Sequence, residues 1–178
     1  MPTAPVHRQS GFSLVEALIP LTVAGVLLGS ALPSLDTMKH RRQLEGSAAQ
    51  LETDLQLARS AAVAANSVLR MDFVAAGDHS CYVLHDGPAR SCDCGTGGVP
   101  ACDAGVTAWR SAHFGVDHPV QLRANVSSVG FDPVKGTVTP TASIRLDSPV
   151  GQLRVVVNVM GRVRSCTPDV ALPGQAAC

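Results

Sequence analysis

Aromatic residues are scarce in this chain of 178 residues, because Phe, Tyr and Trp together make up only 3% of it. Proteins that bind single-stranded nucleic acid stack the bases on aromatic side chains, so this composition argues against a stacking platform. An excess of one charge is also lacking, since 14 basic residues are balanced by 14 acidic ones. Any binding of nucleic acid therefore has to use a local basic patch rather than a field over the whole chain.

The usual motifs of catalysis are missing too. The sequence contains no P-loop, no G-x-G-x-x-G, no H-E-x-x-H and no Ser-His-Asp order. Four scattered histidines show neither metal-binding nor catalytic spacing, namely His79, His85, His113 and His118. We therefore expect a structural and binding protein without a cofactor or a metal. The alternative from another class is a membrane-anchored periplasmic enzyme.

A long apolar run follows a short polar leader. Residues 12–35 carry a single charge, Glu16, and their number matches the roughly 20 apolar residues that cross a bilayer. A secretory signal has its small residues and cleavage site after the apolar run, whereas here the small residue, Gly11, precedes it. A carboxylate within a span is costly and points to a function. The alternative is an ordinary single-span anchor with Glu16 near the membrane interface.

The helix is expected to run from Phe12 to about Asn66, with an amphipathic part over residues 36–66. Its apolar residues recur at steps of three and four along one face: Leu44, Ala48, Leu51, Leu55, Ala58, Ala62 and Ala65. The opposite, polar face is predicted to carry Arg42, Gln43, Glu45, Gln50, Glu52, Asp54 and Arg59. This pattern suits a helix that packs on a sheet with one side.

Short candidate strands follow the helix, separated by clusters of Gly, Pro, Asp and Ser. They are Ser67 to Phe73, Ser80 to His85, Val106 to Trp109, Val120 to Ala124, Ser128 to Phe131, Ala142 to Asp147 and Gln152 to Val159. A Gly- and Cys-rich loop over residues 87–105 is too irregular to predict an element there. One long helix followed by antiparallel strands predicts an α+β fold, with a β-rich domain over residues 67–178.

Six cysteines are many for a chain of this length. Together with an export-type N-terminus, they indicate disulfides that form outside the cytoplasm. Cys166 and Cys178 in the C-terminal tail are expected to form one of them. By the chain-entropy argument, closing this small loop stabilises the fold by about 3 kcal/mol.

The other four cysteines, which are Cys81, Cys92, Cys94 and Cys102, leave their pairing open. Cys92 and Cys94 are too close together to pair comfortably, so each is expected to pair with Cys81 or Cys102. The alternative is a metal site built from Cys92, Cys94, Cys102 and a histidine such as His85. The spacing of these cysteines is not usual for zinc.

The C-terminal part of the chain is locally basic. Gly161 can form a turn, and Arg162 and Arg164 then alternate with Val163. In an extended chain, the two guanidinium groups would point to the same side, roughly 7 Å apart. With Arg154 behind them, they can each neutralise a backbone phosphate. The alternative is a solvated hairpin edge, where charges prevent the aggregation of sheets.

The stretch GFSLVE resembles the class III signal of type IV prepilins and pseudopilins, with Gly11, Phe12 and Glu16 matching. Pro33 resembles the helix-kinking proline of many such pilins. The resemblance implies that a prepilin peptidase cuts after Gly11, removing residues 1–11, and that the new N-terminal Phe12 is N-methylated. It also implies that Glu16 assists assembly by neutralising the N-terminal amine of a neighbouring subunit.

Together with QLARSAAVAANSVLRM and the late GRVR, this signal makes the chain similar to the FimT/GspH family of minor pilins and pseudopilins. In FimT-type members, a C-terminal Gly-Arg-x-Arg motif binds DNA for natural transformation, which implies this role for Gly161, Arg162 and Arg164. The resemblance implies a type IV pilin-like fold whose helix is transmembrane over residues 12–35.

The partners and the location also follow from this resemblance. The chain is expected in the inner membrane with a periplasmic domain, and later in a filament at the cell surface. Its partners would be the peptidase, other pilins and double-stranded DNA. The alternative is a GspH-like pseudopilin of a type II secretion system, which binds protein rather than DNA.

Overall fold

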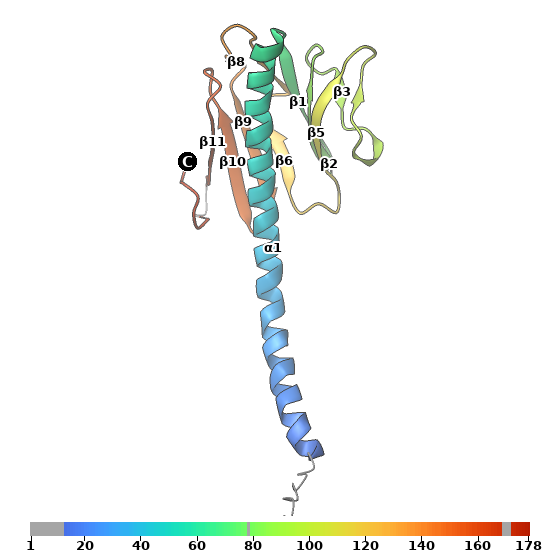
Figure 1. Cartoon of the computed structure of the whole chain (residues 1–178), viewed down its shortest axis with the longest axis vertical. Helices are drawn as coiled ribbons and strands as arrows, with labels where there is room; N and C mark the ends of the chain where they lie inside the picture. Colours follow the sequence, from blue (N-terminus) through green and yellow to red (C-terminus); the bar gives the residue numbers. More distant parts are fainter. Residues whose placement is uncertain (1–12, 78, 169–171) are drawn as a thin grey trace, which may run out of the picture. The chain divides into compact units, whose positions relative to one another are not determined.

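The computed structural model describes residues 13–77, 79–168 and 172–178, except for the side chains of residues 27–34 and of Thr96. Gly11 and Phe12, on which the predicted cleavage depends, lie outside the described residues. The chain forms two compact units, Met1–Met38 and Lys39–Cys178. One helix, α1 (Leu14–Ala65), contributes to both of them (Figure 1), close to the expected bounds.

The start of α1 is stabilised by its own first turn. The backbone N–H of Ser13 donates to Oε2 of Glu16 at 3.4 Å, the reciprocal half of a capping box. A carboxylate is also favourable at the positive end of the helix dipole. The helix continues through Pro20 and Pro33 without interruption. Of the helical segments that the structure describes, none is both long and apolar enough to cross a membrane.

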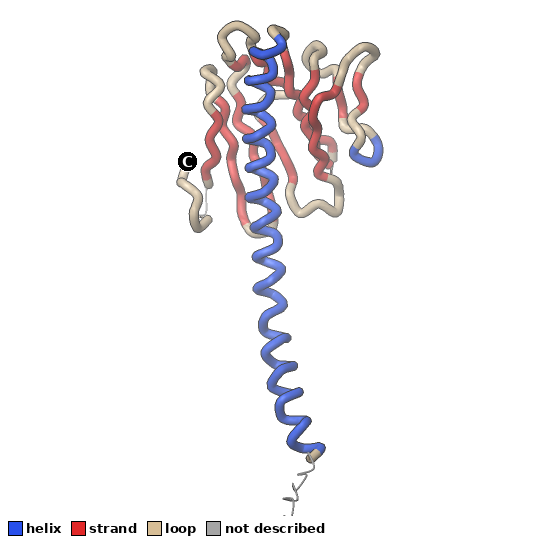
Figure 2. Tube along the Cα trace, viewed as in Figure 1, coloured by secondary structure: helices blue, strands red, loops and turns tan. Residues whose placement is uncertain are grey.

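The second unit contains two larger antiparallel sheets (Figures 1 and 2). The first has the order β5-β2-β1-β7-β8, with β1 (Leu69–Ala76), β2 (His79–His85), β5 (Ala108–Phe114), β7 (Ser128–Phe131) and β8 (Val138–Thr139). The second has the order β11-β10-β9-β6, with β6 (Gln121–Ala124), β9 (Ala142–Ser148), β10 (Gly151–Val157) and β11 (Val163–Cys166). The α+β class is therefore confirmed.

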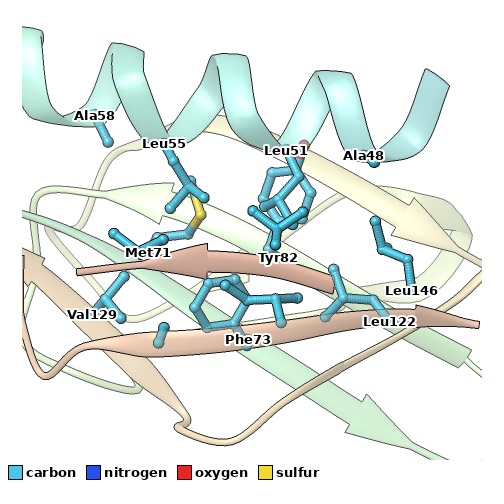
Figure 3. Packing of buried hydrophobic residues seen from close by; sticks show 14 of the residues in the cluster. Ala48, Leu51, Leu55, Ala58, Met71, Phe73, Tyr82, Leu122, Val129 and Leu146 are labelled. Atoms are coloured by element: carbon cyan, nitrogen blue, oxygen red, sulfur yellow. The ribbon is translucent and has the colours of Figure 1, made fainter. Parts of the chain in front are cut away.

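One face of α1 forms the core with both sheets. Six of the predicted face residues are at most 3% exposed, namely Leu44, Ala48, Leu51, Leu55, Ala58 and Ala62. They pack on inward-facing side chains such as Met71 and Tyr82 of the first sheet and Leu122 and Leu146 of the second (Figure 3). Burying a side chain of this size contributes about 1.5–3 kcal/mol. Ala65 is exposed, so its place on this face was predicted wrongly.

Asp54 was also placed wrongly, on the solvent face of the helix. The structure buries it beside Leu51 and Leu55, where Tyr82 Oη donates to its Oδ2 at 2.6 Å. A buried hydroxyl needs a partner, and the carboxylate supplies one within an otherwise apolar interface. The helix and β2 are thus joined by a directional contact as well as by packing.

The strand predictions differ from the structure mainly at the edges of the sheets. Val106 to Trp109 was predicted as a strand, whereas β5 begins at Ala108 and ends at Phe114. The two short strands β8 and β11 were not predicted. The loop over residues 87–105 contains three short elements, namely β3 (Cys92–Asp93), a 3₁₀ turn (Thr96–Gly98) and β4 (Ala101–Cys102). Their brevity leaves no periodic pattern to read.

The structure selects one of the two pairings that the sequence left open. The disulfides and their Cα–Cα distances are Cys81–Cys94 at 5.8 Å, Cys92–Cys102 at 4.0 Å and Cys166–Cys178 at 5.0 Å. The alternative metal site loses its thiolate ligands, because these sulfurs are bonded to one another. Cys81, Val83 and Cys92 form a second small core with Val74 and Val106. The cysteine-rich loop is thereby fixed against β1 and β2.

The buried Tyr82 predicts how the fold responds to alkaline pH. Burial, and then the hydrogen bond and charge of Asp54, raise the pKa of Tyr82 above its ordinary value. The stability that the neutral phenol contributes is complete below pH of about 10 and declines as the pH rises above it. Tyr82 is the sole tyrosine, so phenolate absorbance reports it alone.

We expect this absorbance to appear only together with the loss of the far-ultraviolet circular dichroism of the fold. Both signals are followed on one sample during an alkaline titration. Ionisation near pH 10 in a chain that keeps its native circular dichroism would contradict the buried hydrogen bond.

Candidate functional site: a basic groove beside the β10–β11 turn

A groove of about 810 Å³ lies where three segments of the second unit meet. The segments are the last turns of α1 (residues 56–64), the β7–β8 loop (residues 134–136) and the β10–β11 turn (residues 160–163). These segments are far apart in the sequence, and the loop and the turn lie near the end of α1 in Figure 1. The groove includes Gly161 and Arg162 of the GRVR stretch.

The β10–β11 turn is built by Asn158 and Gly161. The N–H of Gly161 donates to the carbonyl of Asn158 at 2.9 Å, and Oδ1 of Asn158 accepts from the N–H of Arg162 at 2.9 Å. Gly161 has a φ of +73°, a left-handed conformation that favours glycine. This sequence therefore fixes the direction in which the chain leaves the turn toward Arg162 and Arg164.

The β7–β8 loop is built in a similar way around Asp132. Its Oδ1 accepts from the N–H of Lys135 at 2.7 Å and from that of Val134 at 2.9 Å. These two backbone hydrogen bonds lower the pKa of the Asp132 carboxyl. The loop places Lys135 and the carbonyl of Gly136 at the groove.

Arg59 joins the three segments. Its Nε donates to the carbonyl of Gly136 at 2.9 Å. A Cβ on Gly161 would lie 2.8 Å from both Cδ and Nε of Arg59 and 3.0 Å from the Gly136 oxygen. The absence of a side chain at position 161 is therefore what lets the turn approach the helix so closely.

The groove is basic and partly apolar. Arg59, Lys135 and Arg162 contribute cations, and no carboxylate belongs to the described residues that line it. Val134 and Met160 are large, exposed apolar residues at the same place. Guanidinium groups bind phosphate or carboxylate in a bidentate manner, so the groove can accept an anionic partner with an apolar portion.

The predicted arginines do not all belong to the groove. Arg162 and Arg164 are both exposed, and Val163 between them packs against the core. Only Arg162 lines the groove. Arg164 lies on β11, where it pairs with Val156, and Arg154 on β10 pairs with Cys166.

Sequence reasoning missed two of the cations at this groove. Arg59 was assigned to a solvated helix face, and Lys135 was not considered. The stretch DPVKG, residues 132–136, carried a signal, because Asp-Pro followed by Gly favours a turn. Nothing in the sequence indicated which element that turn would contact.

A second polar cluster lies under the cysteine-rich loop. Nε2 of His85 lies 2.8 Å from Oδ2 of Asp72, and both side chains are almost fully buried. Nδ1 of His85 lies 3.4 Å from Oγ of Ser91 and accepts the N–H of Gly87 at 3.1 Å. The Ser91 hydroxyl itself donates to the carbonyl of Pro88 at 2.8 Å.

Asp72, His85 and Ser91 are the residue types of a hydrolytic triad, but they are not arranged as one. A nucleophilic serine must reach a substrate and give its proton to the histidine, whereas Ser91 is buried and its proton is engaged by a carbonyl. The sequence predicted no catalytic spacing for His85. In the structure, Asp72 holds the ring of His85, and His85 accepts the N–H of Gly87 at the start of the loop. The groove remains the better candidate site.

Comparison with known proteins agrees with this fold. A structure of the type IV minor pilin FimU from Pseudomonas aeruginosa superposes with a TM-score of 0.51 at 18% identity, covering 78% of this chain and 98% of that one. The minor pseudopilin EpsH from the type 2 secretion system of Vibrio cholerae gives a TM-score of 0.48 at 14% identity, covering 72% and 99%. The superposition on FimU shows that the fold is that of a type IV minor pilin.

The sequence itself matches a family and a curated relative. Residues 47–161 match the model of the family described as type II transport protein GspH. The chain is 31% identical over 165 residues to a pilin-like protein, PilA1, of Thermus thermophilus, covering 88% of this chain and 97% of that protein. This chain therefore belongs to the GspH family, among the minor pilins and pseudopilins of the GspH/FimT type.

The contact at Gly161 predicts a specific cost of adding a methyl group. Gly105 is a matched control, because its φ of +83° is similar but no atom lies within 4 Å of an added Cβ. We expect Gly105→Ala to destabilise by about 1 kcal/mol through backbone strain. Gly161→Ala should cost about 1–3 kcal/mol more, as overpacking does.

The measurement is the free energy of unfolding by denaturant. In a chain that already carries Arg59→Ala, Gly161→Ala should lose most of its extra cost, since Arg59 contributes the two closest contacts. If Gly105→Ala and Gly161→Ala lost the same free energy of unfolding, Arg59 would not restrict position 161.

Proposed function

We propose that this chain is a minor pilin of a type IV pilus and that it binds double-stranded DNA during uptake for natural transformation. The observation that carries the proposal is the pair of exposed arginines, Arg162 in the hydrogen-bonded β10–β11 turn and Arg164 on β11. Arg162 shares its groove with Arg59 and Lys135. A duplex offers a dense row of phosphates to such a local cluster.

Weak, sequence-independent binding fits the chemistry of the site. Contacts to phosphates position a protein on a duplex but carry no sequence information directly. Two phosphate contacts give a log–log salt slope of about −1.8 and an affinity in the non-specific range of roughly 10⁻⁴ to 10⁻⁶ M. Several pilins on one filament would then add avidity.

We further propose that assembly depends on the N-terminal segment. In this proposal, a prepilin peptidase removes residues 1–11, and the helix over residues 12–35 holds the chain in the inner membrane before it enters a filament of pilins. The description of FimU as a type IV minor pilin supports this role. The exposed apolar side chains at the start of α1 support it as well, Leu14 at 76% and Leu18 at 49%. The role is structural rather than enzymatic.

A second candidate is a pseudopilin of a type II secretion system. The family description names that transport system, and its match ends at residue 161, just before the two arginines. In that case, the groove would bind a protein instead. Its apolar residues Val134 and Met160 would then matter more than its cations.

The DNA proposal is tested with Arg162→Gln combined with Arg164→Gln. Binding of a labelled duplex to the full chain in zwitterionic detergent is measured by fluorescence anisotropy at low salt. We expect the affinity to fall at least tenfold with no change in thermal unfolding, because exposed charges contribute little to stability.

Arg42→Gln with Arg110→Gln is the matched control. It removes the same charge from α1 and from β5 of the first sheet, where both side chains are exposed. An equal loss in this control would mean that net charge alone matters. Undiminished binding by the Arg162 and Arg164 variant would refute the role of this pair, and absence of duplex binding by the unmodified chain would shift the assignment to the secretion pseudopilin.

Glu16 offers a test of the assembly proposal that separates two roles. In this chain, it accepts the N–H of Ser13 and caps the helix; in a filament, it would neutralise a neighbour's N-terminal amine in a low dielectric. Glu16→Gln keeps an oxygen for the cap but loses the charge. We expect Glu16→Gln and Glu16→Ala to impair incorporation into pili alike, as measured by immunoblotting of sheared filaments.

Mass spectrometry of the membrane fraction is the control. Both variants should still begin at Phe12, so that the defect lies in assembly and not in processing. Normal incorporation of Glu16→Gln would limit the role of the carboxylate to capping.

A further inference from the structure

The outer face of the second sheet carries a row of arginines that belongs to no part of the groove. In the strand register, Arg123 on β6 pairs with Arg145 on β9, and Arg145 pairs with Arg154 on β10. Residues paired directly across antiparallel strands point to the same face. The three guanidinium groups therefore start from backbone positions only about 4.8 Å apart from strand to strand.

The alternation of the strands places this row away from the core. The neighbours of these residues, such as Leu122, Ile144, Leu146, Leu153 and Val155, are all buried. Arg123 and Arg145 are exposed, and Arg154 is half-buried. We name this row, Arg123, Arg145 and Arg154, the arginine ladder.

The protein neutralises only one of the three arginines of the ladder. Arg145 has a partner, Asp147, at 3.5 Å, and Gln152 also donates to that carboxylate. In the part of the chain that the structure describes, no carboxylate pairs with Arg123, Arg154 or Arg164. Like charges directly opposite one another destabilise a sheet, so the ladder carries a cost that a bound anion would remove.

Protection of a sheet edge does not account for the ladder. Charges on an edge strand prevent the pairing of sheets, but β9 and β10 are interior strands of the order β11-β10-β9-β6. Only Arg123 on β6 is in a position to act in that way.

A hollow of about 230 Å³ lies over the ladder. Its lining consists of Arg123, Ala124, Asn125, Ser143, Arg145 and Arg154. Oδ1 of Asn125 already accepts the N–H of Ser143 at 2.7 Å, so the polar group that remains on its side chain is an N–H donor. The lining thus combines three guanidinium groups with neutral donors, and its volume is several times the roughly 30 Å³ of one water.

The ladder is continuous with the turn of the proposed DNA site. Arg154 pairs with Cys166, and Arg164 lies two residues before Cys166 on the same face of β11. Diagonal neighbours of this kind are about 7–8 Å apart. The cations therefore extend from Arg162 at the turn, through Arg164 and Arg154, to Arg123 at the far strand.

We infer that the arginine ladder is a second phosphate-binding site, and that the duplex lies across the outer face of the second sheet rather than touching the turn alone. This inference rests on the proposed function, since it takes the phosphates to be those of the DNA backbone. Arginine suits this ligand because its planar fork bonds two phosphate oxygens at once. The hollow holds one phosphate, and Arg164 and Arg162 contact further phosphates of the same DNA strand.

The salt dependence of binding separates the two arrangements. Four arginines without a carboxylate partner, Arg123, Arg154, Arg162 and Arg164, give a log–log slope of about −3.6, whereas the turn alone gives about −1.8. We compare three variants that each lose two charges. They are the ladder variant (Arg123→Gln, Arg154→Gln), the turn variant (Arg162→Gln, Arg164→Gln) and the control (Arg42→Gln, Arg110→Gln).

Anisotropy of a labelled duplex is measured with the full chain in zwitterionic detergent over a range of NaCl concentrations. We expect a slope of about −3.6 for the unmodified chain and the control, and of about −1.8 for the ladder and turn variants. Circular dichroism verifies that each variant is folded. Inorganic phosphate at matched ionic strength should weaken duplex binding by the turn variant, in which only the ladder remains.

Three results would overturn the inference, and they are distinguishable. A slope near −1.8 that the ladder variant leaves unchanged, while the turn variant loses binding, refutes the ladder and leaves the proposed function intact. Absence of duplex binding by the unmodified chain refutes both. Competition by polyglutamate as strong as that by an unlabelled duplex of equal charge would assign this face to an acidic protein surface.

Discussion

The burial of one helix face against two sheets is the constraint on which the rest of the structure depends. Leu51 and Leu55 are completely buried, and the inner faces of both sheets are fixed by contact with them and their neighbours (Figure 3). Because strand side chains alternate, fixing Leu122, Ile144 and Leu153 inward obliges the residues beside them to point outward. The outward positions on β6, β9 and β10 are those of the arginine ladder.

The outer faces of the two sheets differ in what lies on them. The cysteine-rich loop covers that of the first sheet, fixed by Cys81–Cys94 and by the buried pair of His85 and Asp72. The outer face of the second sheet carries cations on β6, β9 and β10, and the Cys166–Cys178 disulfide, through Cys166 on β11, lies beside Arg154. Arg59 connects α1 to the β10–β11 turn, because it holds the Gly136 carbonyl beside Gly161. The packing of the core therefore also positions the proposed DNA contacts.

The sequence predicted the features that are local and periodic. The spacing of Leu44 to Ala62 indicated the buried helix face, and the alternation in residues 142–147 indicated β9. It did not predict that Asp54 is buried, because the partner hydroxyl of Tyr82 lies on another element. The groove depends on contacts such as that of Arg59 with Gly136, 77 residues away, and the ladder depends on strand register. Neither has a signature in a single stretch of sequence.

The central claim is that one duplex contacts both the turn and the sheet face. Its most direct test is NMR of the arginine Nε–Hε groups during titration with a short duplex at low salt. Arg123, Arg154, Arg162 and Arg164 should shift together along one binding curve, while Arg110 on the first sheet stays unchanged. Shifts confined to Arg162 and Arg164, or shifts of Arg110 equal to theirs, would contradict this account.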